Sequence, residues 1–452
     1  MIKIPNDVLL LMNTIENNAG EVHLVGGCVR DMLLDKEPHD YDLVTNLLPD
    51  AIVGLFKNEK TLKIEGKSFG VVSVNDIEIA TYRRDKYYYG MHKNGADIVE
   101  FSEDIIEDMR RRDFTINALT MSSDGKVQDW IEQGISDLNS KTIRFVGEPR
   151  ERIMEDPCRI IRAIRFASQL EFTIEPTQVP TIREMRASIQ LVAKERIYTE
   201  LMRIMDSRHI TASIQAMIDT NTLAYIIPPL WGCWGIGQNR YHKDNVIWHS
   251  IYASDATMYS PLLRMAMLLH DCGKPCVKIF NDATQDYRFR GHDDVSEYIS
   301  LEYFKSMKFP NNEINFMCEV IKNHMFFLND VNSSAIRRIM GKLKYCTIRD
   351  LVRARIADIK GNFLRASDLK TEWLRHILKM IRTIEKEQNA LKITDLAIGG
   401  EDLIKMGLKP GIQFKQILQY CLDKVIENPE QNNYGALTDY VAEYLVRESK
   451  CI

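Results

Sequence analysis

The sequence lacks the long apolar runs and the paired cysteines that mark several other classes of protein. No stretch approaches the ~20 consecutive apolar residues of a membrane-spanning helix, and the first residues show no basic segment followed by an apolar one. The nine cysteines are scattered without a paired CxxC array, which argues against a cysteine zinc cage and favours reduced thiols. We therefore expect a soluble cytoplasmic protein with no membrane partner.

The sequence also lacks an excess of charge of either sign. Its formal net charge is −4 over 452 residues, of which 27% are charged and 45% hydrophobic. This composition is typical of a globular protein with a large core, and the length allows about two to four domains. Because the chain is not a polycation, a nucleic-acid partner would have to be bound by local basic patches.

Hydrophobic periodicity divides the chain into a mixed N-terminal part and a helical remainder. In the first part, the pattern predicts strands over residues 22–25, 41–44, 71–74 and 77–81, a hairpin turn at 75–76, and helices over 7–18 and 29–34. From Glu148 onward the spacing is almost wholly helical, with a proline-containing joint at 227–232. The sequence thus predicts an α+β fold: a small α/β head followed by an all-helical neck, body and tail.

Two glycines and two aspartates follow the first predicted strand. Gly26-Gly27 ends this strand, and Asp40-Tyr41-Asp42 lies on the next one. Residues i and i+2 of a strand point to the same face, so the two carboxylates converge and offer the oxygen ligands that Mg²⁺ prefers. The glycines allow backbone N–H groups to approach a phosphate, and Arg30 with the N-terminus of its helix adds positive potential. The pattern predicts metal-dependent nucleotidyl transfer, in which metal ions bridge a 3′-hydroxyl and a triphosphate.

A third carboxylate would complete such a cluster, and Glu78 is the candidate. It lies on the strand predicted over 77–81. The alternative is that Glu78 is an ordinary exposed strand residue. An isolated Asp-x-Asp is a weak signal as well, so the prediction depends on the combination of strand, glycine pair, helix and aspartates.

The segment Glu155-Asp156-Pro157-Cys158-Arg159 predicts a protein surface that selects bases. If it opens a helix, Pro157 fits the first turn, Asp156 and Arg159 are neighbours, and Glu155 can orient Arg159. An acceptor and a forked donor side by side match the amino group and ring nitrogen of cytosine and adenine. Guanine and uracil present the reverse polarity and would leave buried polar groups unpaired. An ordinary helical ion pair is the alternative.

These segments together resemble the class II CCA-adding enzymes and bacterial poly(A) polymerases. Leu24–Asp31 with Asp40–Thr45 is similar to the first motif of that family, and Arg111–Leu119 to the second, which holds ribose and triphosphate. The resemblance implies Asp40 and Asp42 as the catalytic carboxylates that hold Mg²⁺, and Glu78 stays the candidate third catalytic carboxylate. The nucleotide-binding residues that follow from all these segments are Gly26, Gly27, Arg30, Arg111, Arg112, Asp113, Asn117, Glu155, Asp156, Arg159 and Arg162.

Three further segments continue the resemblance. Residues 129–147 resemble the hinge motif, although the family usually has Gly-Gly where this chain has Gly134-Ile135. Residues 194–201 resemble the last motif, which we interpret as structural packing of the neck. Residues 82–95 correspond to a flexible loop that enzymes adding only C and C lack; here the usual Arg-His-Pro is replaced by Lys93-Asn94-Gly95. Because the loop is present, we expect addition of A as well.

The C-terminal half holds histidines and aspartates suited to a divalent transition metal. His270-Asp271 lies at a predicted helix end, and imidazole with carboxylate suits such an ion if distant residues complete its shell. A lone histidine in such a setting is usually a satisfied core residue. Together, however, the histidines and aspartates between positions 249 and 358 resemble those of the HD phosphohydrolase superfamily. In some CCA-adding enzymes an HD domain has phosphatase or 2′,3′-cyclic phosphodiesterase activity. The predicted ligands are His249, His270, Asp271, His292, His324 and Asp358.

The tail over residues 393–411 resembles the C-terminal segment of bacterial CCA-adding enzymes that carry an HD domain. Lys405, Lys409 and Lys415 could meet tRNA phosphates there, or form a solvated face. We predict four parts: a nucleotidyltransferase head (1–147), a helical neck that selects nucleotides and binds tRNA (148–235), an HD metal-binding domain (236–365) and a helical tRNA-binding tail (366–452).

The resemblance implies template-independent addition of C, C and A to the 3′ end of tRNA from CTP and ATP. One alternative is a bacterial-type poly(A) polymerase, against which the HD module and the tail argue. The other is an HD metal-dependent phosphohydrolase whose head only senses nucleotides, against which the intact Asp40, Asp42 and Arg159 argue. Nothing in the sequence indicates an oligomeric state.

Overall fold

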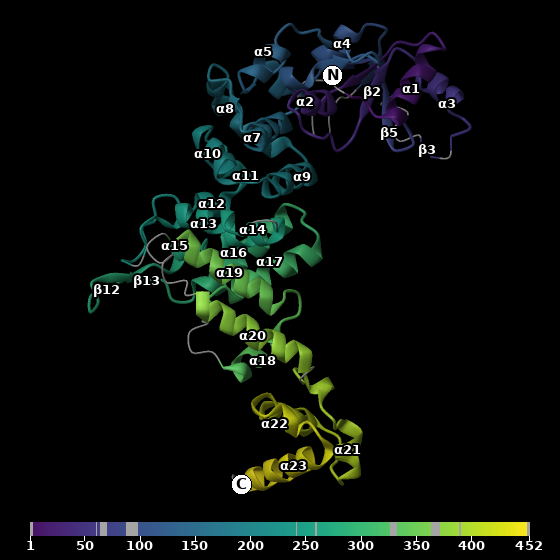
Figure 1. The fold of residues 1–452 in the computed structure, drawn as a ribbon. Helices are drawn as coiled ribbons and strands as arrows, with labels where there is room; N and C mark the ends of the chain where they lie inside the picture. Colours follow the sequence, from purple (N-terminus) through teal and green to yellow (C-terminus); the bar gives the residue numbers. More distant parts are fainter. Residues whose placement is uncertain are drawn as a thin grey trace. The chain divides into compact units, whose positions relative to one another are not determined.

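The computed structural model describes residues 3–59, 61–63, 70–86, 98–240, 242–257, 260–325, 332–362, 371–387 and 390–449. The chain forms two compact units (Figure 1), Met1–Gly232 with Phe304–Phe309 and Cys233–Tyr303 with Pro310–Ile452. The four-part division stays a prediction. No helix of the described residues has both the length and the apolar character that a membrane crossing requires.

A seven-stranded sheet forms the head of the first unit. Its strand order is β3-β4-β5-β2-β1-β8-β9, and all neighbours are antiparallel except β2 and β5, which are parallel. A separate ribbon pairs β6 (Arg83–Lys86) with β7 (Ile98–Phe101). The strands of the sheet are β1 (Val22–Val25), β2 (Asp42–Thr45), β3 (Leu62–Lys63), β4 (Val71–Val74), β5 (Ile77–Thr81), β8 (Leu119–Met121) and β9 (Val127–Asp129).

The strands follow the predicted pattern closely. β1, β4 and β5 have the predicted bounds, and β2 begins one residue later than predicted. Asn75 and Asp76 both have positive φ, 52° and 63°, which is the conformation that a two-residue hairpin turn between twisted strands requires. In β5, Ile77, Ile79 and Thr81 are buried while Glu78 is exposed, so the alternation points Glu78 away from the core.

Short helices cover the sheet and lead into the neck. α2 begins two residues earlier than predicted, directly after Gly26. Ile160, Ile161 and Ile164 on α7 are fully buried, which agrees with the predicted apolar face of this helix. The helices of the first unit are α1 (Asn6–Glu16), α2 (Gly27–Leu33), α3 (Pro49–Leu55), α4 (Ile105–Arg110), α5 (Gly134–Asn139), α6 (Pro149–Glu155), α7 (Cys158–Leu170), α8 (Val179–Met185), α9 (Lys194–Met205), α10 (Thr211–Asp219), α11 (Leu223–Ile226) and α12 (Pro228–Trp231).

The second unit is mainly helical. α13 packs against both α14 and α19, and a Cβ on Gly361 of α19 would lie 2.6 Å from the backbone nitrogen of Ala253, so this close approach requires glycine. The helices that lie in this unit, wholly or in part, are α13 (Val246–Asp255), α14 (Pro261–Leu269), α15 (Lys274–Val277), α16 (His292–Ser306), α17 (Asn311–Asn323), α18 (Ser333–Lys342), α19 (Ile348–Gly361), α20 (Thr371–Glu387), α21 (Gly400–Lys405), α22 (Ile412–Glu427) and α23 (Tyr434–Ser449).

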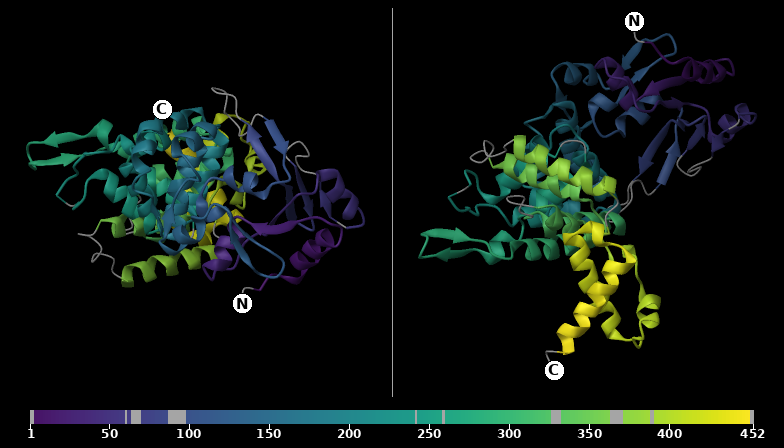
Figure 2. Two further views of the ribbon diagram at one scale, coloured as in Figure 1. Left: turned by 90° about the horizontal axis from the view of Figure 1, so that it is seen from above. Right: turned by 60° about the horizontal axis from the view of Figure 1, so that its bottom comes forward.

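One feature of the second unit departs from the predicted, almost wholly helical pattern. β12 (Ile279–Asn281) and β13 (Asp286–Arg288) form an antiparallel hairpin between α15 and α16. The two ribbon strands extend away from the helices of this unit (Figure 2). Each strand has only three residues, which is too short for a period-two pattern to stand out in the sequence.

Candidate nucleotide site and metal cluster

The three predicted carboxylates gather at the start of β2. The parallel register of β2 and β5 places Asp42 directly beside Glu78. Asp40 lies two residues upstream of Asp42, before the strand begins and not on it as predicted. Burial raises the pKa of Asp42 to about 6, and the negative charges of Asp40 and Glu78 add to this while Arg112 opposes it.

This concentration of negative charge fits a divalent cation. Among the described residues, Asp40, Asp42 and Glu78 make no ion pair, although most charged groups around them do. Carboxylates held close together repel one another when they are ionised. A hard divalent cation that prefers oxygen ligands relieves this repulsion when it binds between them. The donor set is therefore the one that Mg²⁺ prefers.

The glycine pair next to this cluster has one strict requirement. Gly26 has φ 80° and ψ −131°, a backbone conformation that side chains disfavour, and a Cβ there would lie 3.2 Å from an Arg112 guanidinium nitrogen. At Gly27 the nearest atom to an added Cβ would be an Arg30 nitrogen at 3.7 Å, an ordinary contact. The turn thus needs glycine at 26 and brings the backbone close to a cation.

A buried network connects Arg30 to the neck. Arg30 Nη1 donates to Asn117 Oδ1 at 2.8 Å, and Asn117 Nδ2 donates to Asp113 Oδ1 at 3.0 Å. Arg162 of α7 then donates twice to Asp113 Oδ2, at 2.8 and 2.6 Å. Burial opposes the ionisation of Asp113, but Arg162 and Asn117 outweigh it and lower its pKa to about 2. Asp113 is therefore an ionised link between head and neck.

Asp108 holds Arg111 and Arg112, and it is a site residue that the sequence analysis did not identify. Arg111 donates to Asp108 Oδ1 from Nε and Nη2 at 2.9 and 2.7 Å, and Arg112 Nη2 donates to Oδ2 at 3.1 Å. The Asp108 side chain is fully buried. Burial raises its pKa, but the two arginines prevail and lower it. A lone aspartate in a short helix carries no signal of its own, so only the structure identifies this residue.

Glu155 contacts Arg159 as predicted. Arg159 Nη1 donates to Glu155 Oε2 at 2.6 Å and to the Arg152 carbonyl at 3.0 Å, and Nη2 donates to the Arg111 carbonyl at 2.8 Å. The guanidinium is 7% exposed. These bonds fix its plane and use three of its five N–H groups.

Asp156 is held differently from the prediction. The segment does not open a single helix: α6 ends at Glu155, Asp156 is extended, and α7 begins at Cys158. Both Asp156 oxygens accept from Arg196 of α9, at 3.0 and 2.6 Å, so Asp156 and Arg159 are oriented by separate partners. Residues 194–201 thus orient Asp156 in addition to packing the neck. The resemblance of residues 194–201 to the last motif was the sequence signal that could have identified Arg196.

The structure accounts for Gly134-Ile135 at the place where the hinge motif usually has Gly-Gly. A Cβ on Gly134 would lie 2.6 Å from the Thr115 carbonyl oxygen, so this glycine is required. The side chain of Ile135 is 41% exposed, and its backbone N–H donates to Asp129 Oδ2 at 2.9 Å. A side chain at position 135 therefore meets no obstacle. Asp137 accepts from Thr115 Oγ1 at 2.6 Å.

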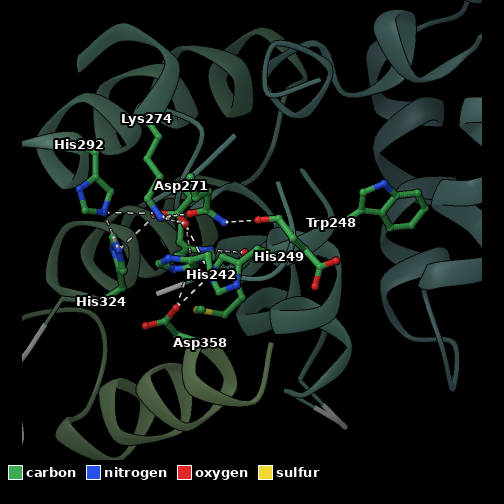
Figure 3. A network of polar contacts seen from close by, with 12 residues as sticks. His242, Trp248, His249, Asp271, Lys274, His292, His324 and Asp358 are labelled. Atoms are coloured by element: carbon green, nitrogen blue, oxygen red, sulfur yellow. Dashed lines mark hydrogen bonds and ion pairs between the residues drawn. The ribbon is translucent and has the colours of Figure 1, made fainter. Parts of the chain in front are cut away.

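The six predicted metal ligands converge in the second unit (Figure 3). They come from α13, the ends of α14 and α17, the start of α16, and α19. Asp271 Oδ2 lies 3.5 Å from His249 Nε2 and 3.3 Å from His270 Nε2, and its Oδ1 lies 3.3 Å from His292 Nε2 and 3.9 Å from His324 Nε2. Asp358 Oδ1 lies 3.0 Å from His249 Nε2 and 3.8 Å from His270 Nε2.

The imidazoles are oriented for ligation. His270, His292 and His324 each place Nδ1 at 2.6 to 2.8 Å from a main-chain carbonyl oxygen, which directs Nε2 into the cluster. His270 Nε2 and Asp271 Oδ2 are both buried and lie 3.3 Å apart. Burial opposes a charge on His270, but Asp271 and Asp358 outweigh it and raise its pKa to about 9. The nitrogen-rich donor set fits a divalent transition metal.

A cavity of 250 Å³ adjoins this cluster. Asp271, His292, His324 and Asp358 line it, together with residues that include Lys274, His242, Phe289 and Arg355. Lys274 Nζ contacts Asp271 Oδ2 and Gln238 Oε1, each at 2.6 Å, and Arg355 pairs with Asp358. A buried and a half-buried cation therefore border the cavity, which suits an anionic group.

The loop predicted over residues 82–95 and the tRNA contacts predicted for the tail lysines stay predictions. Residues 87–95 of the predicted loop lie outside the described residues. Lys405 pairs with Asp402 at 3.2 Å, and Lys409 and Lys415 are exposed, so contact with tRNA phosphates stays a prediction.

Known proteins resemble this chain in sequence. Residues 22–144 match the family model of the Poly A polymerase head domain, and residues 171–232 match the probable RNA and SrmB-binding site of polymerase A. A CCA-adding enzyme of Oceanobacillus iheyensis is 41% identical over 213 residues, 46% of this chain and 52% of that protein. The chain spans about half the length of this relative and of several others. A CCA-adding enzyme of Lactiplantibacillus plantarum is 29% identical over 446 residues, 97% of this chain and 96% of that protein.

Solved structures resemble the chain over its whole length. The Bacillus stearothermophilus CCA-adding enzyme in complex with CTP has a TM-score of 0.70 and 19% identity and covers 98% of each chain. The Thermotoga maritima CCA-adding enzyme complexed with tRNA has a TM-score of 0.59 and 20% identity, over 98% of this chain and 96% of that one. At this identity the likeness concerns the fold, and it confirms the predicted α+β architecture of a sheet-containing head and a mostly helical remainder.

Proposed function

We propose that this chain is a nucleotidyltransferase that adds C, C and A to the 3′ end of tRNA from CTP and ATP. The observation that carries the proposal is the cluster of Asp40, Asp42 and Glu78 beside the Gly26 turn. It is supported by the curated relatives, which are CCA-adding enzymes, and by solved structures of such enzymes with CTP, ATP and tRNA.

The carboxylates and cations of the head have distinct roles in this proposal. Asp40, Asp42 and Glu78 would hold Mg²⁺, which when bound supplies charge stabilisation at the triphosphate and the attacking 3′-hydroxyl. The Gly26 turn lets backbone N–H groups approach the phosphates. Arg111 and Arg112, which Asp108 holds in place, bind the triphosphate and ribose. The fixed positions of these groups orient the nucleotide before reaction.

The neck selects the base in this proposal. Arg159 keeps two N–H groups beyond its three bonds within the chain, and Asp156 Oδ2 keeps a lone pair beyond its bond to Arg196, while Oδ1 accepts from both Arg196 and the Cys158 N–H. Together they offer donors and acceptors to cytosine and adenine. Guanine and uracil would leave these half-buried groups unpaired, at a cost of about 1–3 kcal/mol per group.

A primer-extension assay tests this function. A tRNA that lacks its 3′ end is incubated with Mg²⁺ and each nucleoside triphosphate separately, and then with CTP and ATP together. We expect C, C and A to be added, and Asp42→Ala to abolish addition. Incorporation of A alone onto any RNA end would replace the proposal by poly(A) synthesis. Binding of nucleotide without any extension would favour a head that only senses nucleotides.

We also propose that the second unit is an HD-type domain that hydrolyses a phosphate ester. The observation in favour is the cluster of four histidines and two aspartates, of which Asp271, His292, His324 and Asp358 line a cavity bordered by Lys274 and Arg355. His249, His270, Asp271, His292, His324 and Asp358 would hold one or more divalent transition metal ions, which supply an activated water when bound. The water oxygen bonds to phosphorus, the ester P–O bond breaks, and the leaving oxygen takes up a proton.

Metal binding and hydrolysis test this second function separately. Dialysed protein should bind Mn²⁺ or Co²⁺ in addition to the ions of the head, and His270→Ala should lower the stoichiometry. The same substitution should abolish metal-dependent hydrolysis of p-nitrophenyl phosphate while CCA addition persists. Hydrolysis that survives His270→Ala would exclude the cluster from the chemistry.

A further inference from the structure

The β12–β13 hairpin carries an exposed aromatic face and lies in the chain between Lys274 and Phe289, which both line the metal-cluster cavity. In the hairpin register Phe280 lies opposite Tyr287, and their ring centroids are 5.3 Å apart. Phe280 is 46% exposed and Tyr287 38%. The two rings therefore form an exposed pair, and the hairpin extends away from the helices of its unit (Figure 1).

Cations accompany these rings. Lys278 Nζ lies 3.9 Å from the centroid of the Tyr287 ring, and Lys274 Nζ lies 5.5 Å from that of Phe289. Arg290 follows Phe289 and is exposed, whereas Arg288 lies opposite Ile279 on the other face. Of the two carboxylates at the far end, Asp286 is paired with Arg240 at 3.0 Å and Asp282 is exposed in the turn. The aromatic face therefore lies in a locally positive setting.

Both ends of the hairpin lead into the cavity. On one side the chain runs back through Lys274 to Asp271, and on the other Phe289 and His292 follow Tyr287 closely in sequence. Lys274, Asp271, Phe289 and His292 all line the cavity. Aromatic rings and cations thus form a continuous path from the exposed hairpin to the metal cluster.

We propose that this path binds single-stranded RNA, whose bases stack on Phe280 and Tyr287 while its terminal phosphate enters the cavity. Stacking platforms with accompanying cations are the means by which proteins hold single strands without sequence preference. The substrate class of the second unit is then an RNA end that carries a terminal phosphate, an inference that rests on the hydrolytic function proposed above.

The opposite face of the same hairpin provides a matched control. Ile279 is paired with Arg288, so its side chain lies on the other face from Phe280 and is 68% exposed. Phe280→Ala and Tyr287→Ala remove a stacking surface, whereas Ile279→Ala removes an exposed apolar side chain from the opposite face of the same hairpin. None of the three residues belongs to the metal cluster.

Release of phosphate is measured with the full-length protein on two probes, p-nitrophenyl phosphate and a single-stranded oligoribonucleotide with a 3′-phosphate. We expect Phe280→Ala to raise KM for the oligonucleotide about tenfold, as loss of one stacking contact implies. KM for p-nitrophenyl phosphate should not change, which also shows that the variant is folded. Ile279→Ala should leave both values unchanged. If Phe280→Ala changes neither KM, or no more than Ile279→Ala, the RNA path is overturned while the hydrolase stands.

A photo-crosslinking measurement keeps the inference testable if no hydrolysis occurs at all. A single-stranded oligoribonucleotide with 4-thiouridine near its 3′-phosphate is irradiated with the wild-type protein, and crosslinked peptides are identified by mass spectrometry. Crosslinks to the peptide 279–292 that are lost in Phe280→Ala and kept in Ile279→Ala support RNA binding, even where the hydrolytic function has failed. Absence of crosslinks to this peptide overturns the inference.

Discussion

Asp42→Asn should make the first unit more stable at neutral pH while it abolishes nucleotide addition. Burial, with the neighbouring Asp40 and Glu78, raises the pKa of Asp42 from 3.8 to about 6. Since one pKa unit corresponds to ~1.4 kcal/mol, ionisation of Asp42 destabilises the folded state by about 3 kcal/mol at pH 7. Asp42 is only partly buried, so solvent screening reduces this to about 1–2 kcal/mol.

The gain in stability has a defined pH window. A carboxyl group with a raised folded-state pKa lowers stability as the pH rises from its unfolded pKa toward its folded one, so the advantage of Asp42→Asn is complete only above about pH 6 and fades toward pH 4. Added Mg²⁺ should stabilise the wild type and leave the variant unaffected.

Urea unfolding without divalent ions measures the effect, and hydrogen exchange of peptides that cover β1 and β2 reports the first unit alone. Asp35→Asn is the matched control, because Asp35 is exposed and asparagine tolerates its φ of 54°. An Asp42→Asn protein that is no more stable than the wild type at pH 7, or that keeps its advantage at pH 4, would refute the electrostatic argument.

Three other substitutions test the residues around the site. Arg196→Ala frees Asp156 and should raise misincorporation of U or G about tenfold in single-nucleotide extension, with Arg203→Ala, an exposed arginine on the same helix, as the control. Asp108→Asn removes the buried counter-charge of Arg112 and leaves Arg111 paired with Asp85 at 3.5 Å, so it should lower the unfolding free energy of the first unit by about 3 kcal/mol; an unchanged urea midpoint would contradict this. Gly134→Ala, with a Cβ 2.6 Å from the Thr115 carbonyl, should cost about 1–3 kcal/mol in the same assay, whereas Ile135→Gly should cost under about 1 kcal/mol.

Local patterns allowed the sheet of the head to be predicted well. β1, β4 and β5 have the expected bounds because alternation and a two-residue turn are properties of neighbouring residues. That Asp42 lies beside Glu78 could only be a hypothesis from the sequence. It depends on the parallel pairing of two strands whose partner residues are 36 positions apart in the chain. Asp40 was placed on the strand because strand ends are the least certain part of such a prediction.

What could not be predicted depends on contacts between distant segments. Arg196 reaches Asp156 across 40 positions, and nothing in either segment alone indicates that pairing. Asp108 could not be identified from the sequence either. Its partners are near in sequence, but its complete burial depends on the folding of the whole head. The β12–β13 hairpin was missed because its apolar residues are exposed and its strands are short.

The two candidate metal sites differ in their charge balance and in the donor atoms that they offer. In the head, Asp40, Asp42 and Glu78 are without ion pairs among the described residues, so the site has excess negative charge and only oxygen donors. In the second unit, Lys274 and Arg355 each pair with one oxygen of Asp271 and Asp358, so the cluster offers the other oxygen of each together with four imidazole nitrogens. Excess charge with oxygen donors favours Mg²⁺, whereas nitrogen donors with balanced charge favour a transition metal. The two sites should therefore be loaded independently, and a chelator selective for transition metals should remove hydrolysis without affecting nucleotide addition.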